Sequence, residues 1–311
     1  FSVTPRPIYR ADGAKHPSSY SFPDSLNAEL EEKFGVFPLF KFWGPMTDIT
    51  STQWIADATM HVMDTRLPNL CLTYLPHLDY NLQRLGPKDK KIRKDMKELD
   101  KVVGQLMQKA EALDYDVVVL SEYGIQEVNT PIHINRLLRR KGKIATRIEC
   151  GEEHFDAGAS KAFAVADHQL AHVYVQEGED LEELRQWLEK EEGIAEVLIA
   201  DERAKYDLDH ERSGEIICLA KPNAWFTYYY WLDDSKAPDY ARAVDIHRKP
   251  GYDPVELFMI PGGKKQAAFT LLKKKLGFRY NMQVIPLDAN LVKGSHGVPC
   301  ASPEEGPVLL S

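Results

Sequence analysis

The sequence lacks several features that would assign it to a special class of protein. Only 4 of its 311 residues are cysteine, and no two of them form a CxxC pair. They are Cys71, Cys150, Cys218 and Cys300. A chain of this length does not need disulfides to hold its fold, so we expect a reducing compartment and a cytoplasmic location.

Long apolar runs and an excess of positive charge are also missing. No run reaches the roughly 18 apolar residues that span a bilayer, and the N-terminus has no basic segment followed by an apolar one. We therefore expect neither a membrane association nor a secretion signal. The formal net charge of −8 does not favour a nucleic acid polymer as a partner. The oligomeric state is not indicated.

What the sequence does contain is a pattern of strands and helices. The apolar run NLCLTYLP, residues 69–76, is typical of a strand buried on both faces. Apolar residues then recur every three or four positions from Ile92 to Leu113, which predicts an amphipathic helix. DVVVLSEYG, residues 116–124, predicts a second buried strand. The order strand, helix, strand predicts a parallel sheet with right-handed crossovers.

The remaining segments predict a division of the chain. Residues 1–25 contain four prolines among polar residues, which favours an extended connector. Residues 145–209 alternate short strands with one acidic helix, so we predict a small α+β insertion between two core segments, 1–144 and 210–311. GEIICLAKP, residues 214–222, is expected to return the chain to the main sheet. A late helix is predicted over residues 267–277.

Two acidic residues follow the predicted strands. Asp79 comes after NLCLTYL, and Glu122 comes after VVVLS. Ligands of open α/β sheets bind at the carboxyl ends of strands, and carboxylates that meet there can bind a divalent cation through oxygen. His77 faces the same way as Asp79 if the strand continues. The alternative is that both acids are only turn residues.

Histidines further along the chain add candidates. His247 in DIHRKPGYDP and His296 in KGSHGVP lie beside glycine or proline, in segments where loops place functional groups. A solvated surface histidine is the alternative for each of them. His168 and His172 are four residues apart, but the flanking segments favour strands, which would point their side chains in different directions. We therefore assign His168 and His172 a structural role.

These residues lie in motifs that resemble those of the alkaline phosphatase superfamily, and within it the type I phosphodiesterase or nucleotide pyrophosphatase branch. DYNLQRLGP resembles a metal-binding segment in which Asp is followed four residues later by His, but Gln83 stands at the His position. SEYG resembles Ser-Asp-His-Gly, with Glu122 and Tyr123 at the two ligand positions. GSHG resembles Gly-any-His-Gly and makes His296 a ligand. His247 competes for that role.

The resemblance implies an α/β sandwich with a central, mostly parallel sheet flanked by helices. It also implies a metal-dependent phosphohydrolase that acts on a small phosphorylated substrate through two zinc ions and a covalent phosphoenzyme. We predict that Asp79, Glu122 and His296 hold a divalent cation, with His77 or His247 replacing the lost histidine. Gln83 and Tyr123 are weaker candidates. Because oxygen donors replace imidazoles, magnesium, manganese or calcium would suit the site as well as zinc.

The resemblance further places the Thr or Ser nucleophile ahead of Phe1, so we expect the chain to be a fragment that lacks an N-terminal portion. A second function stays open at this point. Three expected metal ligands have changed, which is also typical of a non-catalytic descendant that binds a phosphorylated ligand or a protein partner.

Overall fold

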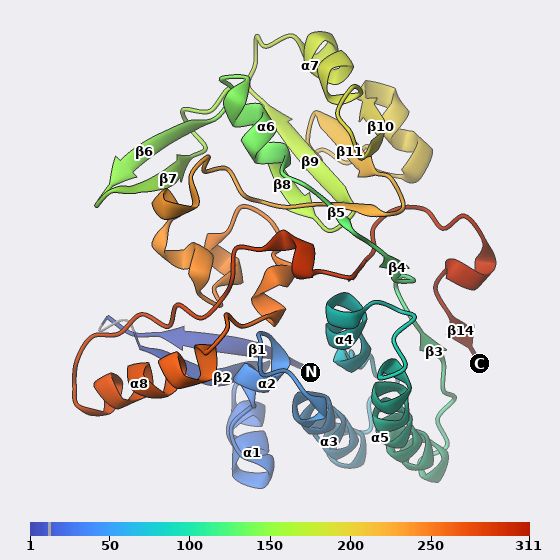
Figure 1. Ribbon diagram of the computed structural model, residues 1–311. Helices are drawn as coiled ribbons and strands as arrows, with labels where there is room; N and C mark the ends of the chain where they lie inside the picture. Colours follow the sequence, from blue (N-terminus) through green and yellow to red (C-terminus); the bar gives the residue numbers. More distant parts are fainter. Residues whose placement is uncertain (12–13) are drawn as a thin grey trace.

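The computed structural model describes residues 1–11 and 14–311 and shows a mixed α/β protein (Figure 1). The chain begins with β1 (Ser2–Tyr9) and β2 (Lys15–Phe22), which pair as an antiparallel hairpin. The extended N-terminal segment is confirmed, but it forms a hairpin rather than a connector. Its prolines are tolerated because each strand of a two-stranded sheet has one edge that needs no ladder hydrogen bonds.

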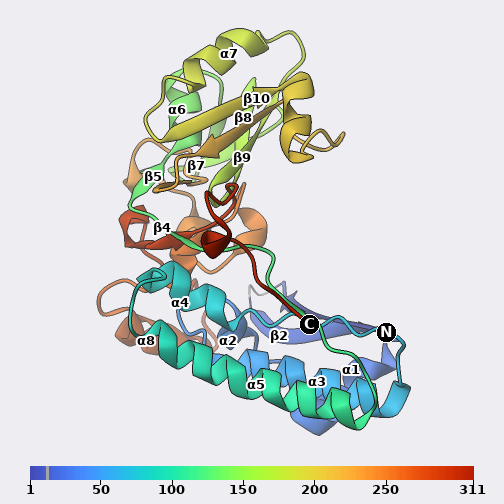
Figure 2. The ribbon, with the colours of Figure 1, turned by 90° about the vertical axis from the view of Figure 1, so that its right-hand side faces the viewer.

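Five helices follow the hairpin, and α1, α3 and α5 lie side by side (Figure 2). The amphipathic helix predicted from Ile92 is confirmed as α5, whose buried residues include Val102 and Ala110. Among the residues that the structure describes, no helix is both long and apolar enough to cross a membrane. The five helices are α1 (Ser25–Phe34), α2 (Leu39–Phe42), α3 (Ile49–Arg66), α4 (His77–Leu85) and α5 (Ile92–Ala112).

The central, mostly parallel sheet that the resemblance implies is not seen. Residues 70–75 alternate in exposure, and Leu70 and Leu72 are 74% and 86% exposed, but no strand among residues 1–11 and 14–311 pairs with them. The second predicted strand is reduced to β3 (Val119–Leu120), which pairs antiparallel with β14 (Leu309–Leu310). Both apolar runs, residues 69–76 and 116–124, were predicted to be strands buried in a sheet. In the part of the chain that the structure describes, neither run lies between two other strands.

The largest sheet lies at the opposite end of the molecule from α1, α3 and α5 (Figure 1). It has four antiparallel strands in the order β10-β11-β9-β8. GEIICLAKP forms β11 of this sheet, so the prediction that it returns to a main parallel sheet is wrong. The predicted acidic helix is confirmed as α7, and the helix α6 lies just before residue 145. The elements are α6 (Ile134–Arg140), β8 (Ala162–Asp167), β9 (Leu170–Val175), α7 (Leu181–Leu188), β10 (Ile194–Ile199) and β11 (Ile216–Ala220).

Short strand pairs and one more helix complete the fold. β12 and β5 form the parallel pair, and the other small pairs are antiparallel. After β12, the aromatic residues from Tyr228 to Trp231 are at most 1% exposed and belong to the largest hydrophobic core. The predicted late helix is confirmed as α8 (Gly263–Lys275). The strands are β4 (Gln126–Glu127), β5 (Thr130–Ile132), β6 (Ala145–Glu149), β7 (Glu152–Asp156), β12 (Ala224–Phe226) and β13 (Gly294–Ser295).

Candidate functional site

Helix α4 presents Asp79 and Gln83 on one of its faces. Both were expected just after a strand, but they are four residues apart on a helix, so their side chains lie one above the other. Gln83 is fully buried, and its Nε2 donates a hydrogen bond of 2.6 Å to Asp79 Oδ2. Gly86, with φ of +82°, ends the helix. The segment DYNLQRLGP is therefore mostly helical, and within it the Gln83 side-chain amide is hydrogen-bonded to the Asp79 carboxylate.

The SEYG segment brings a second donor to the same carboxylate. The Tyr123 hydroxyl donates to Asp79 Oδ1 over 3.2 Å. The segment is held in place by Ser121, whose N–H donates to Val308 O and whose Oγ accepts from Val308 N–H, both at 2.9 Å. Glu122, the other candidate ligand in this segment, is exposed. Both oxygens of Asp79 are thus hydrogen-bonded to side chains.

The GSHG segment carries His296 to this pair. Lys293 N–H donates to the backbone oxygen of Gln83 over 2.8 Å, which ties β13 to α4. Next to it, a Cβ on Gly294 would lie 2.2 Å from Leu82 O, so only glycine allows the two backbones to approach this closely. The His296 ring then stacks on the Tyr123 ring, with centroids 3.5 Å apart and planes 3° from parallel.

His168 also belongs to this cluster, and the sequence did not predict it. Its ring centroid lies 3.9 Å from that of His296 and 4.5 Å from that of Tyr252. It is 3% exposed, has a left-handed φ of 56°, and follows β8 in the turn to β9. Gln169 N–H donates to His296 O over 2.8 Å, so this turn also fixes His296. Only the tight strand-to-strand turn around His168 could have hinted at this placement.

Two predicted candidates lie away from the cluster. His77 is two residues before Asp79, and two positions on a helix differ by about 200°, so the two side chains leave α4 in nearly opposite directions. His77 instead faces Asp95 and Glu98 of α5. His247 is exposed on a short 3-10 turn, Ile246–Arg248, and no hydrogen bond or ring contact of the described residues joins it to Asp79, Tyr123 or His296.

Burial controls the protonation of the cluster. It raises the pKa of Asp79, against the effect of the hydrogen bonds from Gln83 and Tyr123. Burial and the charge of Asp79 raise the pKa of Tyr123, so the phenol keeps its proton at neutral pH. Burial lowers the pKa of His296 to about 4. It also lowers the pKa of His168 well below the usual value, so both imidazoles are neutral at pH 7.

The zinc ligand set that the resemblance implies does not fit this arrangement. Asp79 is not the obstacle, because each of its oxygens accepts one hydrogen bond, from Gln83 or from Tyr123, and keeps a second lone pair. Tyr123 would have to lose its proton, against the direction of its pKa. Among the described residues, Asp79, Glu122 and His296 do not form a group whose ligand atoms lie within 4.8 Å of one another. Asp79 and the neutral His168 and His296 are the metal-capable side chains here.

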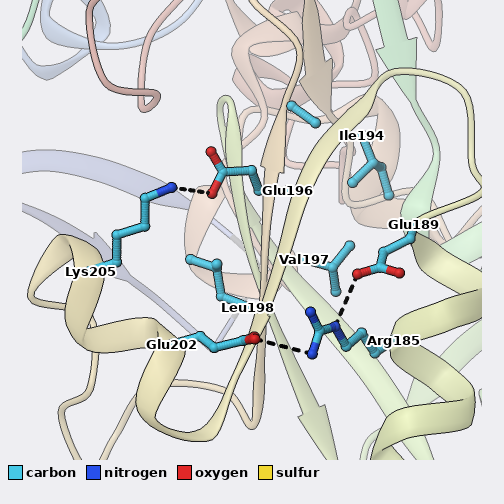
Figure 3. Close-up of a pocket in the computed structure, with 9 residues that line it drawn as sticks. Arg185, Glu189, Ile194, Glu196, Val197, Leu198, Glu202 and Lys205 are labelled. Atoms are coloured by element: carbon cyan, nitrogen blue, oxygen red, sulfur yellow. Dashed lines mark hydrogen bonds and ion pairs between the residues drawn. The ribbon is translucent and has the colours of Figure 1, made fainter.

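A depression of about 550 Å³ lies elsewhere, between α7, β10 and the turn after β10 (Figure 3). Its charged side chains already pair with one another. Arg185 forms ion pairs with Glu189 at 3.0 Å and with Glu202 at 3.2 Å, and Lys205 forms an ion pair with Glu196 at 2.9 Å. No group in it is left to recognise a ligand charge, so we do not place the functional site there.

Comparison with known proteins assigns the family. The sequence matches the model of the type I phosphodiesterase / nucleotide pyrophosphatase family over residues 4–253. The chain belongs to this family, which confirms the resemblance, and the matched residues include DYNLQRLGP and SEYG, while GSHG lies beyond them. No sequence of a curated protein matches the chain significantly.

Solved structures give two similar proteins. Phosphonoacetate hydrolase from Sinorhizobium meliloti 1021, in complex with phosphonoacetate, is 15% identical with a TM-score of 0.42, and the match covers 58% of this chain and 43% of that chain. Murine ectonucleotide pyrophosphatase / phosphodiesterase 5 is 16% identical with a TM-score of 0.40, covering 55% and 43%. The chain thus matches less than half the length of these structures.

Proposed function

We propose that this protein is a phosphoester hydrolase of the phosphodiesterase/pyrophosphatase type, with its active site at Asp79, Tyr123, His168 and His296. The observation that carries the proposal is the meeting of three segments that resemble family motifs and are far apart in the sequence. The Tyr123 hydroxyl lies 3.2 Å from Asp79 Oδ1, and the Tyr123 and His296 rings stack with their centroids 3.5 Å apart. Residues needed only for packing have no reason to unite these particular segments.

The side chains of the cluster can bind and orient a phosphoryl group. A neutral imidazole has one N–H, which can donate to a phosphoryl oxygen, and one lone pair, which can accept a proton. Asp79 accepts a hydrogen bond from the Tyr123 hydroxyl, and that hydroxyl also hydrogen-bonds with the Tyr74 side chain, so its orientation is fixed.

The substrate in this proposal is a small phosphorylated or phosphonate compound. The related structures hold phosphonoacetate and, in a second structure of the murine protein, AMP. The net charge of −8 does not favour a long polyanion. Metal dependence, which the family resemblance implies, stays a prediction of this proposal.

A second function is favoured by one specific observation. Gln83 and Tyr123, which stand where the family has histidines, donate to both oxygens of Asp79 and so take the place of a cation. Hydrogen bonds of this kind stabilise a buried carboxylate without any metal. The alternative is therefore a non-catalytic member of the family that binds a phosphorylated ligand in the same place.

One set of assays separates these two functions. Hydrolysis of bis(p-nitrophenyl) phosphate by the complete protein is measured with and without chelator, alongside binding of AMP by calorimetry. We expect His296→Ala and Asp79→Asn to lower turnover by about 100-fold or more, whereas His247→Ala, at an exposed histidine, leaves it unchanged. Absence of turnover together with AMP binding that His296→Ala abolishes would identify the non-catalytic protein. Turnover that no cluster variant changes would exclude this site.

A further inference from the structure

A second cluster of metal-capable side chains lies on the other face of α4. His77 Nε2 is 3.5 Å from Glu98 Oε2 and 3.8 Å from Asp95 Oδ1. Within the described residues, this is the group of three or more His, Cys, Asp or Glu side chains whose ligand atoms all lie within 4.8 Å of one another. The family motifs do not include Asp95 or Glu98, and the cluster shares no residue with Asp79, Tyr123 and His296.

The local sequence builds this cluster from two packed helices. His77 is the first residue of α4, and Asp95 and Glu98 are three residues apart on α5, so the two acids lie on the same face of that helix. The helices α4 and α5 pack against each other. His77 is 4% exposed and Asp95 is 5% exposed, so packing holds both side chains at the helix interface.

The imidazole of His77 has no hydrogen-bond partner at either nitrogen, although both nitrogens are buried. A buried polar group without a partner costs about 1–3 kcal/mol, so such a group points to a ligand that completes it. The distances to Asp95 and Glu98 are longer than a hydrogen bond. Two ligand atoms that each lie about 2.1 Å from one tetrahedral metal ion are about 3.4 Å apart, which is close to the separations seen here.

Hydrogen bonds from outside the cluster orient the Asp95 carboxylate. Asn81 Nδ2 donates to Asp95 Oδ2 over 2.7 Å, and Arg84 Nε donates to Asn81 Oδ1 over 2.9 Å. This leaves Asp95 Oδ1 directed towards His77. The Glu98 side chain is 31% exposed, which gives an ion and its remaining water ligands access from solvent. Outer hydrogen bonds of this type fix ligand carboxylates in known metal sites.

We propose that His77, Asp95 and Glu98 bind one divalent transition-metal ion, such as Zn²⁺ or Mn²⁺. One imidazole with two carboxylates suits these ions, whereas Ca²⁺ and Mg²⁺ prefer oxygen ligands alone. The charge of the ion balances the two carboxylates, which burial would otherwise penalise. The ion joins α4 to α5 and so steadies the helix that carries Asp79 and Gln83. The site is structural and does not depend on the proposed hydrolase activity.

The test is calorimetric titration of the chelator-treated complete protein with ZnCl₂ and, separately, MnCl₂, together with its thermal midpoint in each metal. We expect one equivalent of at least one of these ions to bind and to raise the midpoint. His77→Ala, Asp95→Asn and Glu98→Gln each should weaken binding by about 10-fold or more. Two control variants, Asp79→Asn and His247→Ala, should bind as the unmodified protein does.

Glu98→Gln keeps the test decisive even where a substitution at a more buried position prevents folding, since Glu98 is the most exposed of the three. Absence of stoichiometric binding of both metals to the unmodified protein would overturn the proposal. It would also be overturned if Glu98→Gln bound metal normally, or if Asp79→Asn lost the ion while the three variants kept it.

Discussion

The contact of Gly294 with α4 provides a sharp test of how the site is assembled. A Cβ at this position would lie 2.2 Å from Leu82 O, 2.9 Å from Ile125 Cγ2 and 3.0 Å from Leu82 C. Two of these three atoms belong to the backbone of α4, and they cannot turn away as a flexible side chain can. Gly294→Ala therefore has to push β13 away from the helix.

The size of the effect follows from the contacts that this movement breaks. Overpacking at a tight position destabilises a protein by about 1–3 kcal/mol. The displacement would also strain the 2.8 Å hydrogen bond from Lys293 N–H to Gln83 O, whose loss adds about 1 kcal/mol. We expect the free energy of unfolding to fall by about 2–4 kcal/mol. His296, two residues further on, should lose its stacking on Tyr123.

Urea denaturation followed by circular dichroism measures the loss of stability, and hydrolysis or AMP binding reports on the site. Gly104→Ala is the matched control, because its Cβ on α5 would meet no atom within 4 Å. Alanine is about 1 kcal/mol better than glycine inside a helix, so this variant should be as stable as the unmodified protein or more stable. If Gly294→Ala unfolded at the same urea concentration as the unmodified protein, the close approach of β13 and α4 would be refuted.

Three other predictions rest on buried polar groups. Asn135→Leu should lower the free energy of unfolding by about 3 kcal/mol, because the Asn135 side chain hydrogen-bonds to both the N–H and the carbonyl of Ala164 at 2.7 Å. Urea denaturation measures this loss, and an unchanged midpoint would contradict the prediction. Lys249→Met should cost about 3–5 kcal/mol at pH 7, since it leaves two buried acids unpaired. This loss should shrink towards pH 5 as Glu256, whose pKa burial raises, takes up a proton, and a loss independent of pH would argue against the buried ion pair. Burial lowers the pKa of His133 to about 4 from 6.5, so the folded state binds its proton less readily than the unfolded state. Stability should therefore fall as the pH drops from 6.5 towards 4, and His133→Gln should flatten this part of the profile in denaturation at each pH.

Local patterns predicted some of the helices, namely α5, α7 and α8, and indicated the family. The spacing of apolar residues predicted α5, and the segment 267–277 predicted most of α8, because a helix depends on residues three and four positions apart. The motifs DYNLQRLGP, SEYG and GSHG were sufficient to indicate the family, which the match over residues 4–253 shows. In each case the signal lies within a short window of the chain.

Strand partners depended on the tertiary structure. An apolar run such as residues 69–76 has the same composition whether another strand covers it or not, and here it is left unpaired among the described residues. The composition of GEIICLAKP likewise did not indicate which strands it pairs with. It forms antiparallel pairs with β9 and β10 and does not join a parallel sheet. Pairing is a non-local choice, so composition predicts that a segment is extended but not what lies beside it.

The candidate site divides in the same way. The sequence by itself indicated that Asp79, Tyr123 and His296 lie in segments that resemble family motifs, because residue types and spacing can be read along the chain. Only the tertiary structure decided that Asp79 lies on a helix between two donors, that His168 packs against His296, and that His77 faces Asp95 and Glu98. The direction of a side chain depends on the element that carries it, and its partners depend on which elements pack together.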